Sequence, residues 1–396
     1  MNQNRKARSK RIGLIFGLTL SLFACTNKQP NTTTSGSGSV VSSGGVQKTQ
    51  VKTGVAVKEL VAGKVADFVR LHPQISEGLE VNIVGRDGDS QDWKRFSETA
   101  QEYIKQLNKA YGLKGEAAIK LLADGSTKNE NLENQINVWE NMLIKSPDVM
   151  ALSAVDMFSM KPQLEAAAES AIPVIGFGSG IEESGYDKSY AGMVETDYRQ
   201  MGRELMEKLQ RVGVTRGKIL ILGSSAKTMS NHQMETGLEE YRKANLPSME
   251  RATLLYRDQA DFERQIKDTS KWQEYNAIIG LSEADVRQAL KLRTEIAELS
   301  ASLPLVEKKA GTKAAVPVVT GVGYNKNFED DLETGALVGL MEINNRELAC
   351  ATVSMALEQA IKVQEKQSPS FYKVKIAYAW IDKQSKDTAE IQLLIG

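Results

Sequence analysis

Polar and aromatic side chains follow several predicted strands at the point where each strand ends. They are Asp89, Ser90, Trp93, Asp156, Phe177, Ser179, Phe262, Ser282, Glu283 and Tyr324. Carboxylates and hydroxyls can hold the hydroxyl groups of a ligand by hydrogen bonds, and aromatic faces can cover the apolar face of a sugar ring. Each residue alone is also compatible with an ordinary loop or core position, so the inference depends on the whole set. The set indicates non-covalent binding of a small polar ligand.

The sequence lacks the motifs that covalent or cofactor chemistry requires. A Ser–His–carboxylate triad would need His72 or His232, the only two histidines, and no G-x-S-x-G turn is present. The glycines of residues 176–180 lack G-x-G-x-x-G spacing, and residues 223–225 are not followed by G-K-[ST]. We therefore expect no catalytic residue and no cofactor.

One loop concentrates three carboxylates, Asp87, Asp89 and Asp92. Clustered oxygen ligands suit calcium, but the spacing is not that of an EF-hand. Two histidines and few cysteines also disfavour a zinc site. Recognition of ligand hydroxyls, or a solvated loop, is the preferred interpretation, and no metal site is predicted.

The first 25 residues have the organisation of a bacterial secretory signal. A basic stretch from Arg5 to Arg11 precedes an apolar segment, residues 12–23, that is short for a membrane span. Residues 22–25 read LFAC, which resembles a lipobox in which Cys25 is lipidated; an ordinary signal-peptide end is the alternative. Residues 26–54 are rich in Ser, Gly and Thr and predict a flexible tether. We expect a lipid-anchored protein on the extracytoplasmic side of a membrane.

Composition narrows the function classes further. Fifty basic and fifty acidic residues give no net charge, which argues against a nucleic-acid partner. A length of 396 residues with 41% hydrophobic content fits a soluble α/β protein of two domains. Cys350 lies in a helical pattern and is predicted to be a buried core thiol.

The elements that must position these residues alternate between strand and helix. Residues 134–180 read as helix, buried strand, acidic loop, helix and buried strand, which is a parallel unit with its ligand edge at the strand carboxyl ends. A second, similar series begins with the predicted strand KILILGSS, residues 218–225. The pattern predicts an α/β fold with two similar doubly wound parallel-sheet lobes. Residues 372–382 and the final IQLLIG are predicted to be closing strands.

The predicted boundaries follow from these two series. Residues 55–78 form an amino-terminal helix extension ahead of the main fold. The first lobe is expected to comprise residues 79–194 plus about 345–375. The second is expected to comprise residues 195–344 plus about 376–396.

From about Leu79 to the carboxyl end, the sequence resembles the type I periplasmic binding proteins, the ribose-binding-like receptors and sugar-binding lipoproteins of ABC importers. The segments that carry the resemblance are DVMALSAVDMFSMKPQLEAAAESAIPVIGF, YRQMGRELMEKL, METGLEEY, ADFERQ and YNAIIGLSEADVRQAL. The resemblance implies two lobes that close on a small ligand like a venus flytrap, with no reaction.

Several positions match the binding residues of that family. Trp93 occupies the place of a ring-stacking aromatic, with Asp89 and Ser90 at neighbouring polar places. Asp156 matches the acidic residue of a P-T-D-like turn, and Phe262 matches an aromatic of the second lobe. Ser282 and Glu283 stand where many members have Asn-Asp. The resemblance therefore implies that these residues contact the ligand.

Departures from the family pattern concern the clamp on sugar hydroxyls. Many sugar binders carry Asp-Arg where this chain has Gly178 and Ser179, and the usual arginine near residues 231–234 is replaced. The G-F-D-G-like turn reads GVGY at residues 321–324 and has lost its aspartate. A common pentose or hexose is therefore not assumed as the ligand.

These observations predict a lipid-anchored solute-binding protein that captures a carbohydrate or polyol and passes it to an ABC permease. A receptor of the same fold that signals to a membrane kinase or chemoreceptor is the alternative. An enzyme of the cell envelope is disfavoured because histidines are few and nucleophile motifs are missing.

Overall fold

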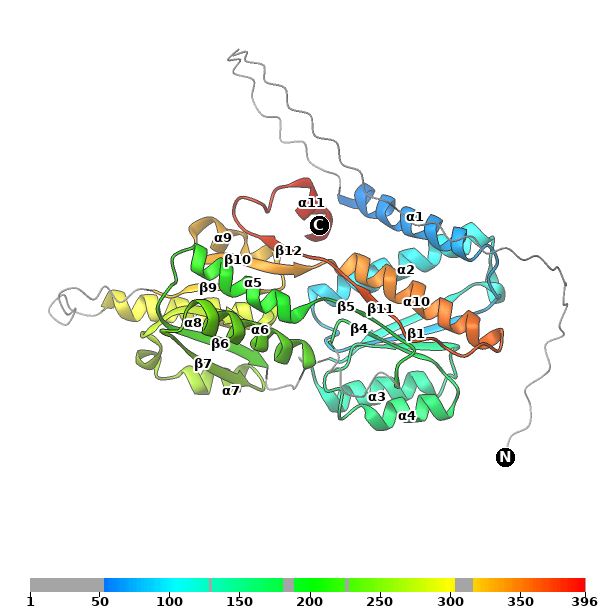
Figure 1. Ribbon diagram of the computed structural model, residues 1–396, viewed down its shortest axis with the longest axis horizontal. Coiled ribbons are helices and arrows are strands. Elements are labelled where there is room, and N and C mark those ends of the chain that lie inside the picture. Colours follow the sequence, from blue (N-terminus) through cyan, green and yellow to red (C-terminus); the bar gives the residue numbers. More distant parts are fainter. Residues whose placement is uncertain (1–52, 128–129, 181–188, 225–227, 303–315, 396) are drawn as a thin grey trace, which may run out of the picture. The chain divides into compact units, whose positions relative to one another are not determined.

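Two sheets with helices on both faces make up the described chain (Figure 1). The computed structural model describes residues 53–127, 130–180, 189–224, 228–302 and 316–395. The predicted signal peptide, Cys25 and nearly all of the predicted tether lie outside these ranges. Within them, none of the helices has the length and apolar character that crossing a membrane requires.

The first sheet is parallel throughout and has the strand order β11-β5-β4-β3-β1-β2. Its strands are β1 (Glu80–Gly85), β2 (Lys120–Gly125), β3 (Val149–Leu152), β4 (Val174–Phe177), β5 (Gly192–Glu195) and β11 (Lys373–Lys375). The accompanying helices are α1 (Thr53–Leu71), α2 (Gln91–Tyr111), α3 (Leu132–Leu143), α4 (Lys161–Glu169) and α10 (Asn345–Gln364). Helices α2 and α10 cover one face, and α3 and α4 cover the other (Figure 1).

The second sheet has the order β12-β10-β9-β8-β6-β7, and only the β10–β12 pair is antiparallel. Its strands are β6 (Gly217–Ser224), β7 (Met249–Tyr256), β8 (Tyr275–Gly280), β9 (Val318–Val322), β10 (Leu337–Ile343) and β12 (Tyr378–Ile381). The helices are α5 (Tyr198–Arg211), α6 (Met229–Asn245), α7 (Gln259–Ile266), α8 (Glu283–Ser302), α9 (Glu329–Thr334) and α11 (Ala389–Ile395). The two sheets confirm the predicted fold class.

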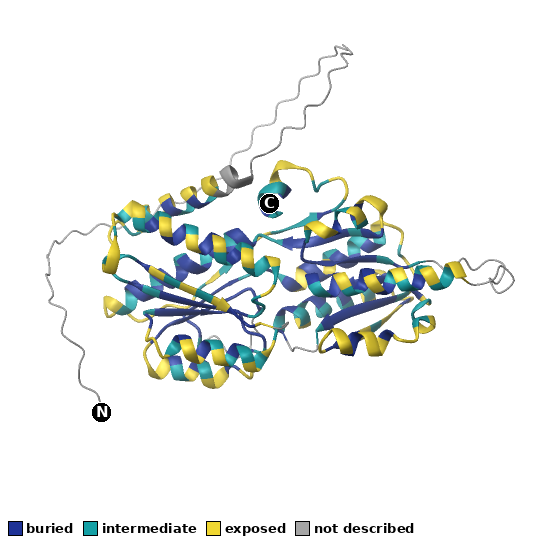
Figure 2. Ribbon diagram, turned by 180° about the vertical axis from the view of Figure 1, so that it is seen from behind, coloured by how far each residue is buried: buried dark blue, intermediate teal, exposed yellow. Residues whose placement is uncertain are grey.

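Successive residues of a strand pack into separate hydrophobic cores on the two faces of each sheet. On β6, Ile219 and Ile221 pack with α5 and α6, whereas Leu220 and Leu222 pack with α7 and α8. Side chains of a strand point alternately to opposite faces, so a strand covered on both sides must be apolar at every position. This is why short continuous apolar runs mark the inner strands, such as β3, β4 and β8, which are buried over almost their whole length (Figure 2).

Side-chain caps fix where the helices begin, and with them the loops at the ligand edge. Ser90 Oγ accepts a hydrogen bond from the Trp93 backbone N–H at 3.1 Å, which starts α2 directly after β1. Asp197 caps α5 and Asn344 caps α10 in the same way. The α2 cap sets the first turn of the helix, and Trp93 lies in that turn.

The chain returns to the first sheet after completing most of the second. Helix α10 packs against α2 and the first sheet, and Cys350 within it is buried as predicted. Strand β11 then pairs with β5, and β12 pairs with β10 of the second sheet. Sequence-distant segments therefore meet at the strand ends.

The structure corrects the prediction for the carboxyl end. Residues 389–395 form helix α11 rather than a closing strand. Ile391 and Leu394 are buried at a spacing of three residues, and the Thr388 hydroxyl accepts a hydrogen bond from the Ile391 N–H. A run as short as IQLLI fits the apolar spacing of a strand as well as that of a helix, and it forms a helix here. The short helix α9 was also absent from the prediction.

Candidate functional site

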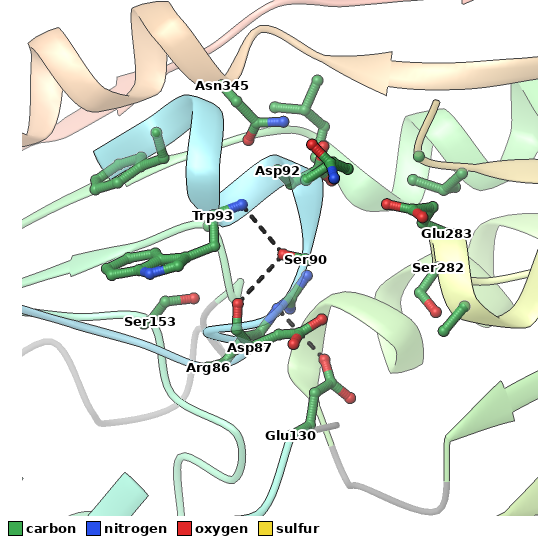
Figure 3. A pocket seen from close by; sticks show the side chains of 18 of the residues that line it. Arg86, Asp87, Ser90, Asp92, Trp93, Glu130, Ser153, Ser282, Glu283 and Asn345 are labelled. Atoms are coloured by element: carbon green, nitrogen blue, oxygen red, sulfur yellow. Dashed lines mark hydrogen bonds and ion pairs between the residues drawn. The ribbon is translucent and has the colours of Figure 1, made fainter. Parts of the chain in front are cut away.

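A cavity of about 260 Å³ lies at the carboxyl ends of strands from both sheets. The segments after β1, β3 and β4 supply one side, and those after β8, β9 and β10 supply the other. Figure 3 shows side chains from the two sides pointing toward a common space. This is the edge at which parallel α/β sheets place their ligands.

Six of the ten predicted binding residues line this cavity. They are Asp89, Ser90, Trp93, Phe177, Ser282 and Glu283. The first four come from the first sheet and the last two from the start of α8. The topology therefore brings together residues that are nearly 200 positions apart in the sequence.

The other four predicted residues lie outside the cavity wall. Asp156 accepts hydrogen bonds from the Phe158 and Ser159 backbone N–H groups and stabilises the turn before α4. The Ser179 side chain is buried, and its carbonyl accepts from the Ser230 N–H at 2.8 Å. Phe262 is fully buried against Tyr256, and the buried Tyr324 donates its hydroxyl hydrogen bond to Glu329.

Three stacked aromatic rings form the apolar wall of the cavity. Trp93 stacks on Phe96 with centroids 5.5 Å apart, and Phe96 stacks on Phe177 at 4.7 Å. The Trp93 indole also lies over Gly85, where an added Cβ would come within 2.6 Å of two indole carbons. Glycine at position 85 is therefore required for the observed position of the indole.

Two buried polar atoms in the cavity wall have no hydrogen-bond partner among the described residues. They are Oε2 of Glu283 and Nδ2 of Asn345, in residues that are 8% and 7% exposed. A buried polar group without a partner costs about 1–3 kcal/mol. One acceptor at the start of α8 and one donor at the start of α10 thus remain for a ligand (Figure 3).

An ion pair borders the cavity on the side of the first sheet. Arg86 Nε lies 3.4 Å from Glu130 Oε1, and Arg86 Nη1 donates to Ser230 Oγ of α6 at 2.7 Å. Burial raises the pKa of the Glu130 carboxyl, and the neighbouring guanidinium opposes that rise. Burial, and then repulsion from Glu130, raises the pKa of Asp87 to about 6.

A second ion pair joins the two sheets behind the cavity. Arg95 of α2 donates to Glu342 Oε1 of β10 at 2.8 Å and to Asp92 Oδ1 at 2.6 Å. Glu342 is fully buried, and its other oxygen accepts from the Tyr324 N–H at 2.7 Å. Burial, and then the charge of Asp92, raises the pKa of Glu342 well above its ordinary value.

A buried carboxyl supports the α8 side of the wall. Asp285 accepts from the Tyr256 hydroxyl at 2.6 Å and from Ser282 Oγ at 2.7 Å. Burial raises its pKa to about 7, and these two hydrogen bonds oppose the rise. Asp285 therefore orients Ser282 rather than facing the cavity itself.

Sequence reasoning missed Arg86, Glu130, Asn325 and Asn345 as cavity residues. Arg86 and Asn345 each follow a buried strand within two residues, and that position was the available signal. Glu130 and Asn325 carry no such signal because they lie on longer loops.

The loop of Asp87, Asp89 and Asp92 does not gather its carboxylates around one point. Asp87 Oδ1 accepts from the Asp89 N–H, and Asp92 pairs with Arg95. No group of three or more His, Cys, Asp or Glu side chains in the described ranges is arranged to hold a metal ion.

Comparison with known proteins identifies the fold and the family. The family model for the periplasmic binding protein domain matches residues 89–364. No curated protein sequence matches the chain significantly.

Several solved structures of transport proteins share the fold. A carbohydrate transporter solute-binding protein from Agrobacterium radiobacter, solved with D-arabinose, has a TM-score of 0.64 and 17% identity, covering 80% of this chain and 99% of its own. An ABC transporter solute-binding protein from Agrobacterium vitis, solved with D-fucose, has a TM-score of 0.62 and 18% identity, covering 80% and 100%. A glucose-galactose binding protein from Geobacillus stearothermophilus has a TM-score of 0.60 and 13% identity, covering 78% and 98%.

At these identities the solved structures establish the fold, and the family match covers well over half of the sequence. The resemblance read from the sequence is thereby confirmed. The chain belongs to the periplasmic binding protein family and is a solute-binding protein rather than an enzyme.

Proposed function

We propose that this chain binds a monosaccharide or a related polyol in the cavity between its two sheets. The observation that carries the proposal is the pairing of a stacked aromatic wall with unpartnered polar atoms of Glu283 and Asn345. An aromatic face covers the C–H face of a sugar ring, while buried donors and acceptors fix its hydroxyls. The volume of about 260 Å³ is below the range of roughly 300–1,000 Å³ typical for drug-sized ligands.

The transport role is part of the same proposal. Lobe closure around the ligand would create the form that an ABC permease recognises. Two structures that share this fold are those of transporter solute-binding proteins, which supports this role. The proposed binding residues are the six predicted residues that line the cavity, together with Arg86 and Asn345. The ligand would reach the site outside the cytoplasm, where the protein is held by a lipid on Cys25.

Purified protein is expected to gain thermal stability with members of a panel of aldoses, ketoses and polyols. A ligand that binds only the folded state adds about 2.7 kcal/mol at one hundred times its Kd. This shift is measurable by differential scanning fluorimetry, with isothermal titration calorimetry on each hit. If no member of a broad panel shifts the transition or gives heat, the cavity does not bind carbohydrates.

The lipid anchor is expected to depend on one sulfur atom. In a bacterial host, the Cys25→Ser variant should lose incorporation of labelled fatty acid and leave the membrane fraction, because a single acyl-bearing residue provides the hydrophobic attachment. Cys350→Ser is the matched control, since that thiol is buried within α10. Equal labelling of the wild type and the Cys25→Ser variant would contradict the anchor.

A further inference from the structure

The cavity wall carries more negative than positive charge. Its carboxylates are Asp87, Asp89, Asp92, Glu130 and Glu283, and its only two guanidinium groups among the described residues are those of Arg86 and Arg287. Negative charges therefore exceed positive ones by three. A cleft with such an excess attracts cations and repels anions, and its low-dielectric walls strengthen both effects.

The two cationic side chains are each already engaged with a carboxylate. Arg86 lies against Glu130 and reaches across to Ser230. Arg287 contacts Oε1 of Glu283, and its side chain is 61% exposed. In the loop after β1, Asp92 pairs with Arg95 of α2, and Asp87 and Asp89 also line the cavity.

Glu283 independently indicates that the ligand carries a hydrogen-bond donor. Its Oε1 accepts from Asn325 Nδ2 at 2.7 Å and from Arg287. Its Oε2 is buried without a partner among the described residues, although the side chain points into the cavity (Figure 3). A buried carboxylate oxygen needs a donor, and a charged donor gives a bond about twice as strong as a neutral one.

We propose that the ligand is an amine-bearing polyol, such as an amino sugar or an aminoalditol, whose ammonium group binds Glu283 Oε2. This inference rests on the proposed function and narrows its substrate class. The ring or chain carbons lie on the Trp93 face, and the hydroxyl groups take the Asn345 amide and the polar loop after β1. The ammonium is the counter-charge favoured by a wall whose described residues include more carboxylates than guanidinium groups. A sugar acid or sugar phosphate adds to the repulsion and is excluded.

Matched ligand pairs test the amine directly. The pairs are D-glucosamine with D-glucose, D-galactosamine with D-galactose, and 1-amino-1-deoxy-D-glucitol with D-glucitol, titrated calorimetrically into the purified protein at low ionic strength. At least one amine is expected to bind at least tenfold more tightly than its neutral parent, and D-glucuronate is expected not to bind. Added salt should reduce the difference.

The outcomes separate this inference from the function on which it rests. If a neutral sugar or polyol binds and no amine exceeds its parent, the ligand is neutral: the inference fails and polyol binding stands. If no amine, sugar or polyol binds, both fail together.

Two substitutions of opposite sign test the role of Glu283. Glu283→Gln removes the charge and keeps the shape, and it is expected to reduce the preference for the amine at least tenfold. Arg287→Gln removes a competing cation and is expected to increase amine affinity severalfold. Glu263→Gln is the matched control, because this carboxylate lies on α7, pairs with Lys291 and is outside the cavity wall. An unchanged preference in Arg287→Gln would overturn the assignment even if Glu283→Gln failed to fold.

Discussion

Replacing Arg95 by Met is expected to lower the free energy of unfolding by about 3–5 kcal/mol, the cost of breaking a buried ion pair from one side. Arg95 is 12% exposed at its side chain, and the partner Glu342 is fully buried. The substitution keeps most of the apolar stem but removes the donors to Glu342, Asp92 and the Tyr324 carbonyl. Glu342 would retain only the Tyr324 N–H. Chemical denaturation, monitored by circular dichroism, measures the loss.

The double variant Arg95→Met with Glu342→Gln is expected to recover at least half of that loss. No charge is then buried alone, and the glutamine oxygen can still accept from the Tyr324 N–H. Asp67→Ala, which breaks the exposed pair with Arg70, is the control and should change stability by less than about 1 kcal/mol. A loss of that small size in Arg95→Met would show that the buried pair contributes little.

The Arg95→Met variant should also be more sensitive to pH than the wild type. Loss of Arg95 removes the charge that opposes the raised pKa of Glu342. The folded state then holds a proton that the unfolded chain releases near its ordinary pKa. Stability is therefore retained at low pH and lost as the pH rises through the raised folded-state value, by at most about 1.4 kcal/mol per pH unit. The double variant, which has no carboxyl at position 342, should lack this dependence.

The fold was predictable because the strands are covered on both faces. Continuous apolar runs such as those of β3, β4 and β6 do not fit strands with one exposed face. The segments between these runs have the apolar spacing of helices. Prediction failed for α9 and α11, which have six and seven residues. Segments this short contain too few turns for a period to emerge, so tertiary contacts decide their state.

The candidate site was predictable where a residue closely follows a strand. Ser90, Phe177 and Ser282 line the cavity because the strand ends converge in a parallel sheet. The position of a residue after a strand does not determine the direction of its side chain. Phe262 turns into the core beside Tyr256, and Asp156 caps its own turn. Glu130 depends on its distant partner Arg86, a contact that only the folded chain creates.

Replacing Trp93 by Ala is expected to weaken ligand binding by about 10- to 100-fold while the protein stays folded. The indole stands at the end of the stacked wall, lines the cavity and is only partly buried, so part of it is open to a ligand. Losing the burial of a large apolar group costs about 1.5–3 kcal/mol, and each 1.4 kcal/mol is tenfold in Kd. Calorimetry with the best ligand of the panel measures the change. A Kd within twofold of the wild-type value would remove Trp93 from the site.

Two further variants distinguish the position of the indole from its mere presence. Gly85→Ala retains Trp93 but places a methyl group where two indole carbons lie at 2.6 Å, so the ring must move. Its Kd should rise in the same direction as that of Trp93→Ala, by a smaller factor. Trp272→Ala removes a partly buried indole that packs against Tyr275, away from the cavity wall, and should leave Kd unchanged. Because both tryptophan substitutions remove the same side chain, a loss of binding confined to positions 85 and 93 reports contact with the ligand rather than a general loss of packing.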